Sequence, residues 1–145
     1  MARVLVIDDE EDVVNAVKRR LERAGHSVET AADSMEGIKM ISSVPTPYDA
    51  IITDMSMDQS AAGLQVLHAA FTRDLFAAVI VMTAYGNVAN AVESMRRGAF
   101  DYIEKNSPDV DVFELLTTKV EEALERRRRD ARTIDLWDRS VRNGD

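Results

Sequence analysis

The sequence predicts an α/β fold built on a doubly wound, five-stranded parallel sheet. Continuous apolar segments, typical of strands, alternate along the chain with segments whose apolar residues recur at helical spacing. Strand segments such as VIVM at 79–82 lack polar alternation, which fits burial on both faces. Because each parallel crossover needs a covering helix, a series of βα units predicts helices on both sides of the sheet.

Each element is placed by its own signal. Val13, Val17 and Leu21 indicate the first helix. Gly25, Gly98 and the Pro-Thr-Pro run at 45–47 mark helix ends. The strands are expected at residues 3–7, 27–31, 50–53, 78–83 and 100–103.

Composition narrows the function classes. The chain has 145 residues, 46% of them apolar, which suits one domain with a substantial core. A net charge of −8 argues against direct nucleic-acid binding, and the absence of cysteine excludes disulfides and thiolate metal sites. No apolar stretch approaches the roughly 20 residues needed to cross a bilayer, and the N-terminus does not resemble a signal peptide. We therefore expect a cytoplasmic protein without membrane contact.

Polar residues gather where the predicted strands end. Asp8 and Asp9 follow the first strand, Asp54 follows the third, Thr83 ends the fourth and Lys105 lies just past the fifth. In an open α/β sheet, ligands bind beyond the carboxyl ends of the strands. Taken singly, these residues have ordinary explanations as helix caps, turn residues, a strand threonine and a surface lysine. Their joint placement at one edge indicates a site.

Three carboxylates at one edge favour a divalent cation, because without one they would repel each other. The expected ion is Mg²⁺, which prefers oxygen ligands and keeps water positions open. We expect Asp9 to bind it directly, Asp8 to help through water, and Asp54 and the backbone carbonyl of Ser56 to complete the protein ligands.

The same set suits phosphoryl chemistry. Asp54, at the middle of the cluster, is the expected nucleophile, which would form an aspartyl phosphate. Thr83 can donate its hydroxyl to one phosphoryl oxygen, and Lys105 can pair with another as a point charge. The cation would cancel charge as the phosphoryl group transfers.

These motifs resemble the receiver domain of two-component response regulators. The resemblance covers about residues 1–125 and rests on DDE at 8–10, Asp54, MTAYG at 82–86 and RRGAFDYIEK at 96–105. The segments around TAYG are most similar to receivers of the nitrogen-regulatory class. The resemblance implies a flavodoxin-like (βα)5 fold with strand order 2-1-3-4-5.

The resemblance also implies a function. Asp54 would accept a phosphoryl group from a histidine kinase or phosphotransfer protein, with self-phosphorylation and self-dephosphorylation as the only chemistry. Thr83 and Tyr102 match the family's switch residues, and their movement would reshape the surface formed by the fourth helix, fifth strand and fifth helix. The output protein or domain is unknown. An ordinary half-buried tyrosine is the alternative for Tyr102.

Two departures from the family pattern affect the site. Asn106 follows Lys105 where the family usually has a cis proline, so this peptide bond is expected to be trans or strained. The segment after Asp54 lacks the usual proline and is about one residue longer before Gly63. Ser56 and Tyr85 lie at positions that tune phosphoryl lifetime in the family.

The chain continues past the expected receiver as a helical extension over residues 126–145. Apolar residues follow a heptad-like pattern that Arg127 and Asp130 interrupt. A dimerising or linking helix and an ordinary last helix with a frayed tail both fit. The heptad positions are Phe113, Leu116, Val120, Ala123, Ile134, Trp137 and Val141.

Two other function classes stay open at this point. A metal-dependent phosphohydrolase could use the same nucleophile, but such enzymes usually carry a second acid two residues later, where this chain has Ser56. A receiver-like interaction module that works without phosphorylation is the second alternative. The intact set Asp8, Asp9, Thr83 and Lys105 disfavours it.

Overall fold

The computed structural model describes residues 2–55, 62–84 and 86–143. Strands and helices alternate along the chain, as the sequence predicts. The elements are β1 (Arg3–Ile7), α1 (Glu11–Arg23), β2 (Ser27–Ala31), α2 (Ser34–Ser43), β3 (Ala50–Asp54), α3 (Ala62–Arg73), β4 (Ala78–Ala84), α4 (Val88–Arg96), β5 (Asp101–Lys105) and α5 (Val112–Arg142).

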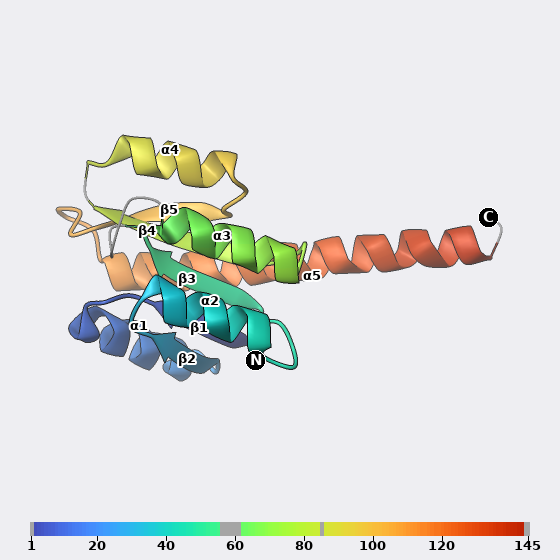
Figure 1. The fold of residues 1–145 in the computed structure, drawn as a ribbon, viewed down its shortest axis with the longest axis horizontal. Helices are drawn as coiled ribbons and strands as arrows, with labels where there is room; N and C mark the ends of the chain where they lie inside the picture. The colour runs from blue at the N-terminus through green and yellow to red at the C-terminus, as the bar shows by residue number, and fades with distance from the viewer. Residues whose placement is uncertain (1, 56–61, 85, 144–145) are drawn as a thin grey trace.

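The five strands form one parallel sheet in the order β2-β1-β3-β4-β5. This order confirms the predicted flavodoxin-like topology. One side of the sheet packs with α1 and α5 around a core that includes Val4, Ile52 and Leu116. The other side packs with α2 and α3 around a second core that includes Leu5 and Val66. Figure 1 shows the sheet between these helices.

Local signals placed most element boundaries correctly. Gly25, with φ of 96°, follows α1 and adopts the left-handed conformation that glycine tolerates without cost. A Cβ at Gly37 would clash with the side chain of Ile7, so glycine allows α2 to approach β1 closely. The predicted last strand is displaced: Phe100 precedes β5, and the strand continues to Lys105 because residues 101–105 pair with residues 80–84 of β4.

The long helix α5 divides into two parts. Its first half buries Leu116, Val120, Ala123 and Leu124 against the domain. Arg127 ends this packed half through ion pairs with Asp74 at 2.6 Å and Asp49 at 3.2 Å. Beyond it, α5 projects away from the sheet (Figure 1), and Ile134, Trp137 and Val141 are exposed. In the first half of α5, the predicted heptad residues Leu116, Val120 and Ala123 are therefore part of the domain core.

Among the described residues, no helix combines the length and the apolar character that crossing a membrane requires.

Candidate functional site at the carboxyl edge of the sheet

The topology brings the predicted residues together. Asp8 follows β1, Asp54 ends β3, Thr83 lies next to the end of β4, and Lys105 ends β5. Because β1, β3, β4 and β5 are neighbours in the sheet, their carboxyl ends meet at one edge. The sequence predicted this convergence, although Lys105 is the last residue of its strand rather than a loop residue.

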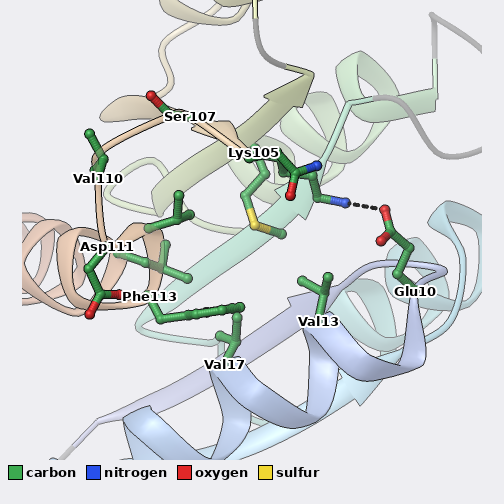
Figure 2. Close-up of a pocket in the computed structure, with 12 residues that line it drawn as sticks. Glu10, Val13, Val17, Lys105, Ser107, Val110, Asp111 and Phe113 are labelled. Carbon is green, nitrogen blue, oxygen red and sulfur yellow. Dashed lines mark hydrogen bonds and ion pairs between the residues drawn. The ribbon is translucent and has the colours of Figure 1, made fainter.

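Lys105 connects the acids of the site. Its Nζ atom lies 2.8 Å from Asp54 Oδ2, 2.8 Å from Asp8 Oδ2 and 3.0 Å from Glu10 Oε1. The side chains of Asp8, Asp54 and Lys105 are 0%, 2% and 10% exposed, whereas that of Glu10 is 61% exposed. Figure 2 shows the contact between Lys105 and Glu10. The ammonium is thus the countercharge of two buried acids and of one acid at the exposed rim.

Burial and pairing shift the pKa values of these groups in identifiable ways. Burial alone would lower the pKa of Lys105, but hydrogen bonds to Asp54, Asp8 and Glu10 outweigh it and raise the pKa above its ordinary value. Burial raises the pKa of Asp8, aided by the nearby charge of Asp54, while hydrogen bonds from Lys105 and the Glu10 amide oppose the rise. Lys105 is therefore a permanent cation at neutral pH.

The acids suit a hard cation. Ligand oxygens of Asp8, Asp9, Glu10 and Asp54 all lie within 4.8 Å of one another. Asp9 and Glu10 are exposed, while Asp8 and Asp54 are buried, so the cluster is open to solvent on one side. Carboxylate oxygens gathered in this way fit Mg²⁺, which usually retains several waters.

Thr83 lies one residue before the end of β4, the strand between those that end at Asp54 and Lys105. The residue is fully buried, and its hydroxyl has no hydrogen-bond partner among the described residues. A buried hydroxyl without a partner costs free energy, roughly 1–3 kcal/mol. Such a group is suited to meet an oxygen atom that arrives with a ligand.

Tyr102 lies on β5 and is 38% exposed. Val88, Val92 and Met95 of α4 are also exposed. Tyr102 therefore lies on the strand that the family resemblance includes in the expected signalling surface, and its role as a switch stays a prediction.

The peptide bond between Lys105 and Asn106 is trans, as are all peptide bonds among the described residues. Asn106 adopts a φ of 56°, a left-handed conformation that asparagine tolerates better than most residues. The Lys105 side chain still reaches Asp54, so the missing proline does not displace it. Ser56 and Tyr85, for which we predicted roles as a carbonyl ligand and a lifetime-tuning residue, lie outside the described residues.

Sequence reasoning missed the contact made by Glu10. This residue is the N-cap of α1, a position where serine, threonine, aspartate and asparagine are preferred. Its side chain makes no capping hydrogen bond with the helix and reaches Lys105 instead. The sequence shows only a glutamate directly after the acid pair, which does not specify the direction in which its side chain turns.

A cavity of about 280 Å³ adjoins the site between α1 and the start of α5. Val13 and Val17 of α1 face Phe113 across it, and the pair of Lys105 and Glu10 stands at one end (Figure 2). Most of its wall is apolar, but Asn106, Ser107 and Asp111 also line it, and Asp111 lies at the end away from Glu10 (Figure 2).

Comparison with known proteins agrees with this geometry. The family model described as the response regulator receiver domain matches residues 4–117. An NtrX-like response regulator of Rickettsia typhi is 36% identical over 103 residues, which cover 70% of this chain and 21% of the relative. The chain thus spans about a fifth of the length of this relative.

Solved structures give the same result. NtrX from Brucella abortus in complex with ADP matches with a TM-score of 0.81 and 30% identity, over 99% of this chain and 30% of that one. The beryllofluoride-activated NtrC4 receiver domain dimer matches with a TM-score of 0.72 and 31% identity, over 88% of this chain and 99% of that one. With the strand order and the acid cluster already established, these matches show that the chain belongs to the receiver-domain family of two-component response regulators.

Proposed function

We propose that this chain is a phosphoacceptor signalling switch in which Asp54 takes a phosphoryl group from a histidine kinase or a phosphotransfer protein. The observation that carries the proposal is the Lys105 ammonium, 2.8 Å from the buried Asp54 carboxylate within a cluster of acids. A buried aspartate held beside a permanent cation is the arrangement that an anionic phosphoryl donor requires. Membership of the receiver family supports it.

The transfer step follows from the residues. An Asp54 carboxylate oxygen forms the new bond to phosphorus, and the bond from phosphorus to the donor nitrogen breaks, with its electron pair passing to the imidazole. Lys105 then pairs with one phosphoryl oxygen, and the Thr83 hydroxyl gains an acceptor that it lacks among the described residues.

Asp8, Asp9 and Asp54 would hold Mg²⁺, with the Ser56 carbonyl as a further ligand. When bound, the ion supplies neutralisation of the phosphoryl oxygens and of the acids around them. The oxygen-only ligand set supports this choice of metal.

The signal would leave the site through Thr83 and Tyr102. Movement of Thr83 toward the phosphoryl group frees space behind it, and the Tyr102 ring turns inward to use that space. The surface of α4, β5 and α5 then changes its contacts with an output protein or domain. The exposed position of the Tyr102 ring is a suitable starting state for this movement.

The projecting half of α5 supports a second element of the proposal, a homodimer. Ile134, Trp137 and Val141 form an exposed apolar row at coiled-coil spacing beyond residue 127. The projecting part of α5 covers residues 128–142. An isolated helix of about that length is marginal in water, so a partner would stabilise this part of α5. The NtrC4 receiver domain, a structural neighbour, is described as a dimer.

We place the protein in the cytoplasm, where histidine kinases present their phosphoryl groups, and propose no turnover of an external substrate. A phosphohydrolase and a phosphorylation-independent module are the rivals. Intact mass after incubation with acetyl phosphate separates them: one added phosphoryl group that requires Mg²⁺ supports the switch. An unmodified mass with Mg²⁺ bound supports the interaction module, and steady release of phosphate from simple phosphate esters supports the hydrolase.

A further inference from the structure

Glu10 has an unusual position for a glutamate. It is the N-cap of α1 with an extended backbone (φ −89°, ψ 105°), yet its carboxylate accepts no hydrogen bond from the helix. A short polar side chain there would typically stabilise the helix by about 1 kcal/mol. Instead, Glu10 Oε1 lies 3.0 Å from Lys105 Nζ. The Glu10 side chain thus contacts Lys105 and makes no capping hydrogen bond with α1.

The three acids around Lys105 are not equivalent. Asp8 and Asp54 are buried, and the proposed function requires both to turn their oxygens to a divalent cation. The oxygens that contact Lys105 belong to these same two carboxylates. Glu10 is the third partner and stands at the solvent-exposed rim. A dication that binds Asp8 and Asp54 would therefore compete with the ammonium.

Near Lys105, the acid at the exposed rim is Glu10, whereas Asp111 lies at the opposite end of the adjoining cavity (Figure 2). On the other side of the ammonium lies this cavity, whose walls include Val13, Val17 and Phe113 (Figure 2). Moving a charged group among such side chains carries a desolvation cost. Glu10 offers an anionic acceptor on the open side, next to the position that Lys105 already occupies.

We propose that Glu10 is a positioning residue for Lys105, which retains the ammonium at the rim of the site when a divalent cation takes over Asp8 and Asp54. This inference rests on the proposed function, because the cation expected at Asp8 and Asp54 is the Mg²⁺ that phosphoryl transfer to Asp54 would need. Without Glu10, the ammonium would remain on the two buried acids and oppose binding of the cation.

A double-mutant cycle tests the proposal. Mg²⁺ affinity is measured by calorimetry for the wild type, Glu10→Gln, Lys105→Met and the double variant. We expect Glu10→Gln to weaken Mg²⁺ binding about threefold when Lys105 is present, within the range of exposed ion pairs. In the Lys105→Met background the same change should have no effect, because the acid acts through the lysine.

Two further variants separate contact from charge. Glu11→Gln removes the same charge one residue further on, in the first turn of α1, and should leave the affinity within about twofold of the wild-type value. Glu10→Asp keeps the charge but shortens the side chain, so it should weaken Mg²⁺ binding as Glu10→Gln does while it improves the helix cap and raises the unfolding midpoint.

Two results would overturn the proposal. If Glu10→Gln weakens Mg²⁺ binding equally in the wild-type and Lys105→Met backgrounds, Glu10 is a direct metal ligand. If Glu10→Gln causes no loss in the wild-type background, the residue has no part in cation binding. The Mg²⁺ affinity and the unfolding midpoint can both be measured without phosphorylation. If the wild-type protein binds Mg²⁺ but gains no phosphoryl group, the proposed function fails while the cycle still reports on Glu10.

Discussion

Lys105 Nζ lies 2.8 Å from Asp54 Oδ2, although 51 residues separate the two in the chain. The sheet order explains the contact, because β4 lies between β3 and β5 and all three strands end at the same edge. The pair places a permanent positive charge against the expected phosphoacceptor before any ligand arrives.

Removing the ammonium should destabilise the metal-free protein. Lys105→Met leaves Asp8 and Asp54 buried without their countercharge, and breaking a buried ion pair typically costs about 3–5 kcal/mol. Unfolding by urea in EDTA measures the loss. Mg²⁺ should restore part of the stability, because it supplies the missing positive charge. Lys39→Met, at an exposed position of α2, is the control; a loss no larger than that of the control would contradict the prediction.

Asp8 should make stability depend on pH in an unusual direction. Because burial raises its pKa in the folded state, the folded protein takes up this proton more readily than the unfolded one. The contribution of Asp8 to stability therefore falls as the pH rises from the ordinary value of 3.8 through the raised pKa. Asp8→Asn should unfold at a higher temperature than the wild type at pH 7 in EDTA, and the gap should shrink toward pH 4.

The control for this experiment is Asp12→Asn, which removes an exposed acid from the first turn of α1. It should show no stabilisation at pH 7. If the wild type is more stable than Asp8→Asn at pH 7 without metal, the ion pair with Lys105 stabilises the protein by more than burial of the Asp8 charge costs. That result would contradict the prediction.

Thr83→Val should separate stability from signalling. The hydroxyl is buried without a partner among the described residues, so its replacement by a methyl group should leave the free energy of unfolding unchanged or raise it by up to about 1 kcal/mol. The phosphoryl adduct should still form, but Tyr102 should no longer change its environment on phosphorylation, as followed by NMR of its ring.

Thr53→Val is a matched control, because this hydroxyl is also buried and without a partner among the described residues. It should resemble Thr83→Val in stability and keep the Tyr102 response. A normal response in Thr83→Val would remove Thr83 from the switch.

The exposed row on α5 should drive self-association. Ile134→Asp should weaken the dimer by about tenfold or more in analytical ultracentrifugation, because a charge at a seam position opposes packing. Leu136→Asp changes another exposed apolar residue, 63% exposed against 51% for Ile134, that lies outside the row and should have a smaller effect. Trp137 is the sole tryptophan, so its emission should shift to the blue as the protein concentration rises. A monomeric wild type, or equal effects of the two variants, would contradict the dimer.

Much of the fold was predictable because buried parallel strands leave a strong pattern. The apolar runs that became β1 and β2 ended where predicted, and Gly25 stopped α1 as expected. The start of β5 was misplaced, since Phe100 is apolar but precedes the residues that pair with β4. Pairing with a neighbouring strand, rather than composition, sets that boundary.

The site was predictable to a similar degree. Asp8, Asp54 and Lys105 converge as expected because strand ends in a parallel sheet share an edge, and Thr83 lies near the end of the strand between Asp54 and Lys105. The part played by Glu10 depends on which way one side chain turns from a helix cap, and no pattern in the sequence specifies this. The heptad pattern likewise could not reveal that Arg127 is tied to Asp74 and that the packed half of α5 ends there.

The most direct test of the central claim is to locate the phosphoryl group in the chain. The protein is treated with acetyl phosphate and Mg²⁺, the acyl phosphate is reduced with borohydride to leave homoserine in place of the modified aspartate, and the peptides are sequenced by mass spectrometry. We predict homoserine at position 54 alone, and no modification in Asp54→Asn or without Mg²⁺. Homoserine at position 8 or 9, or an unmodified Asp54 in a protein that binds Mg²⁺, would contradict the assignment of Asp54 as the phosphoacceptor.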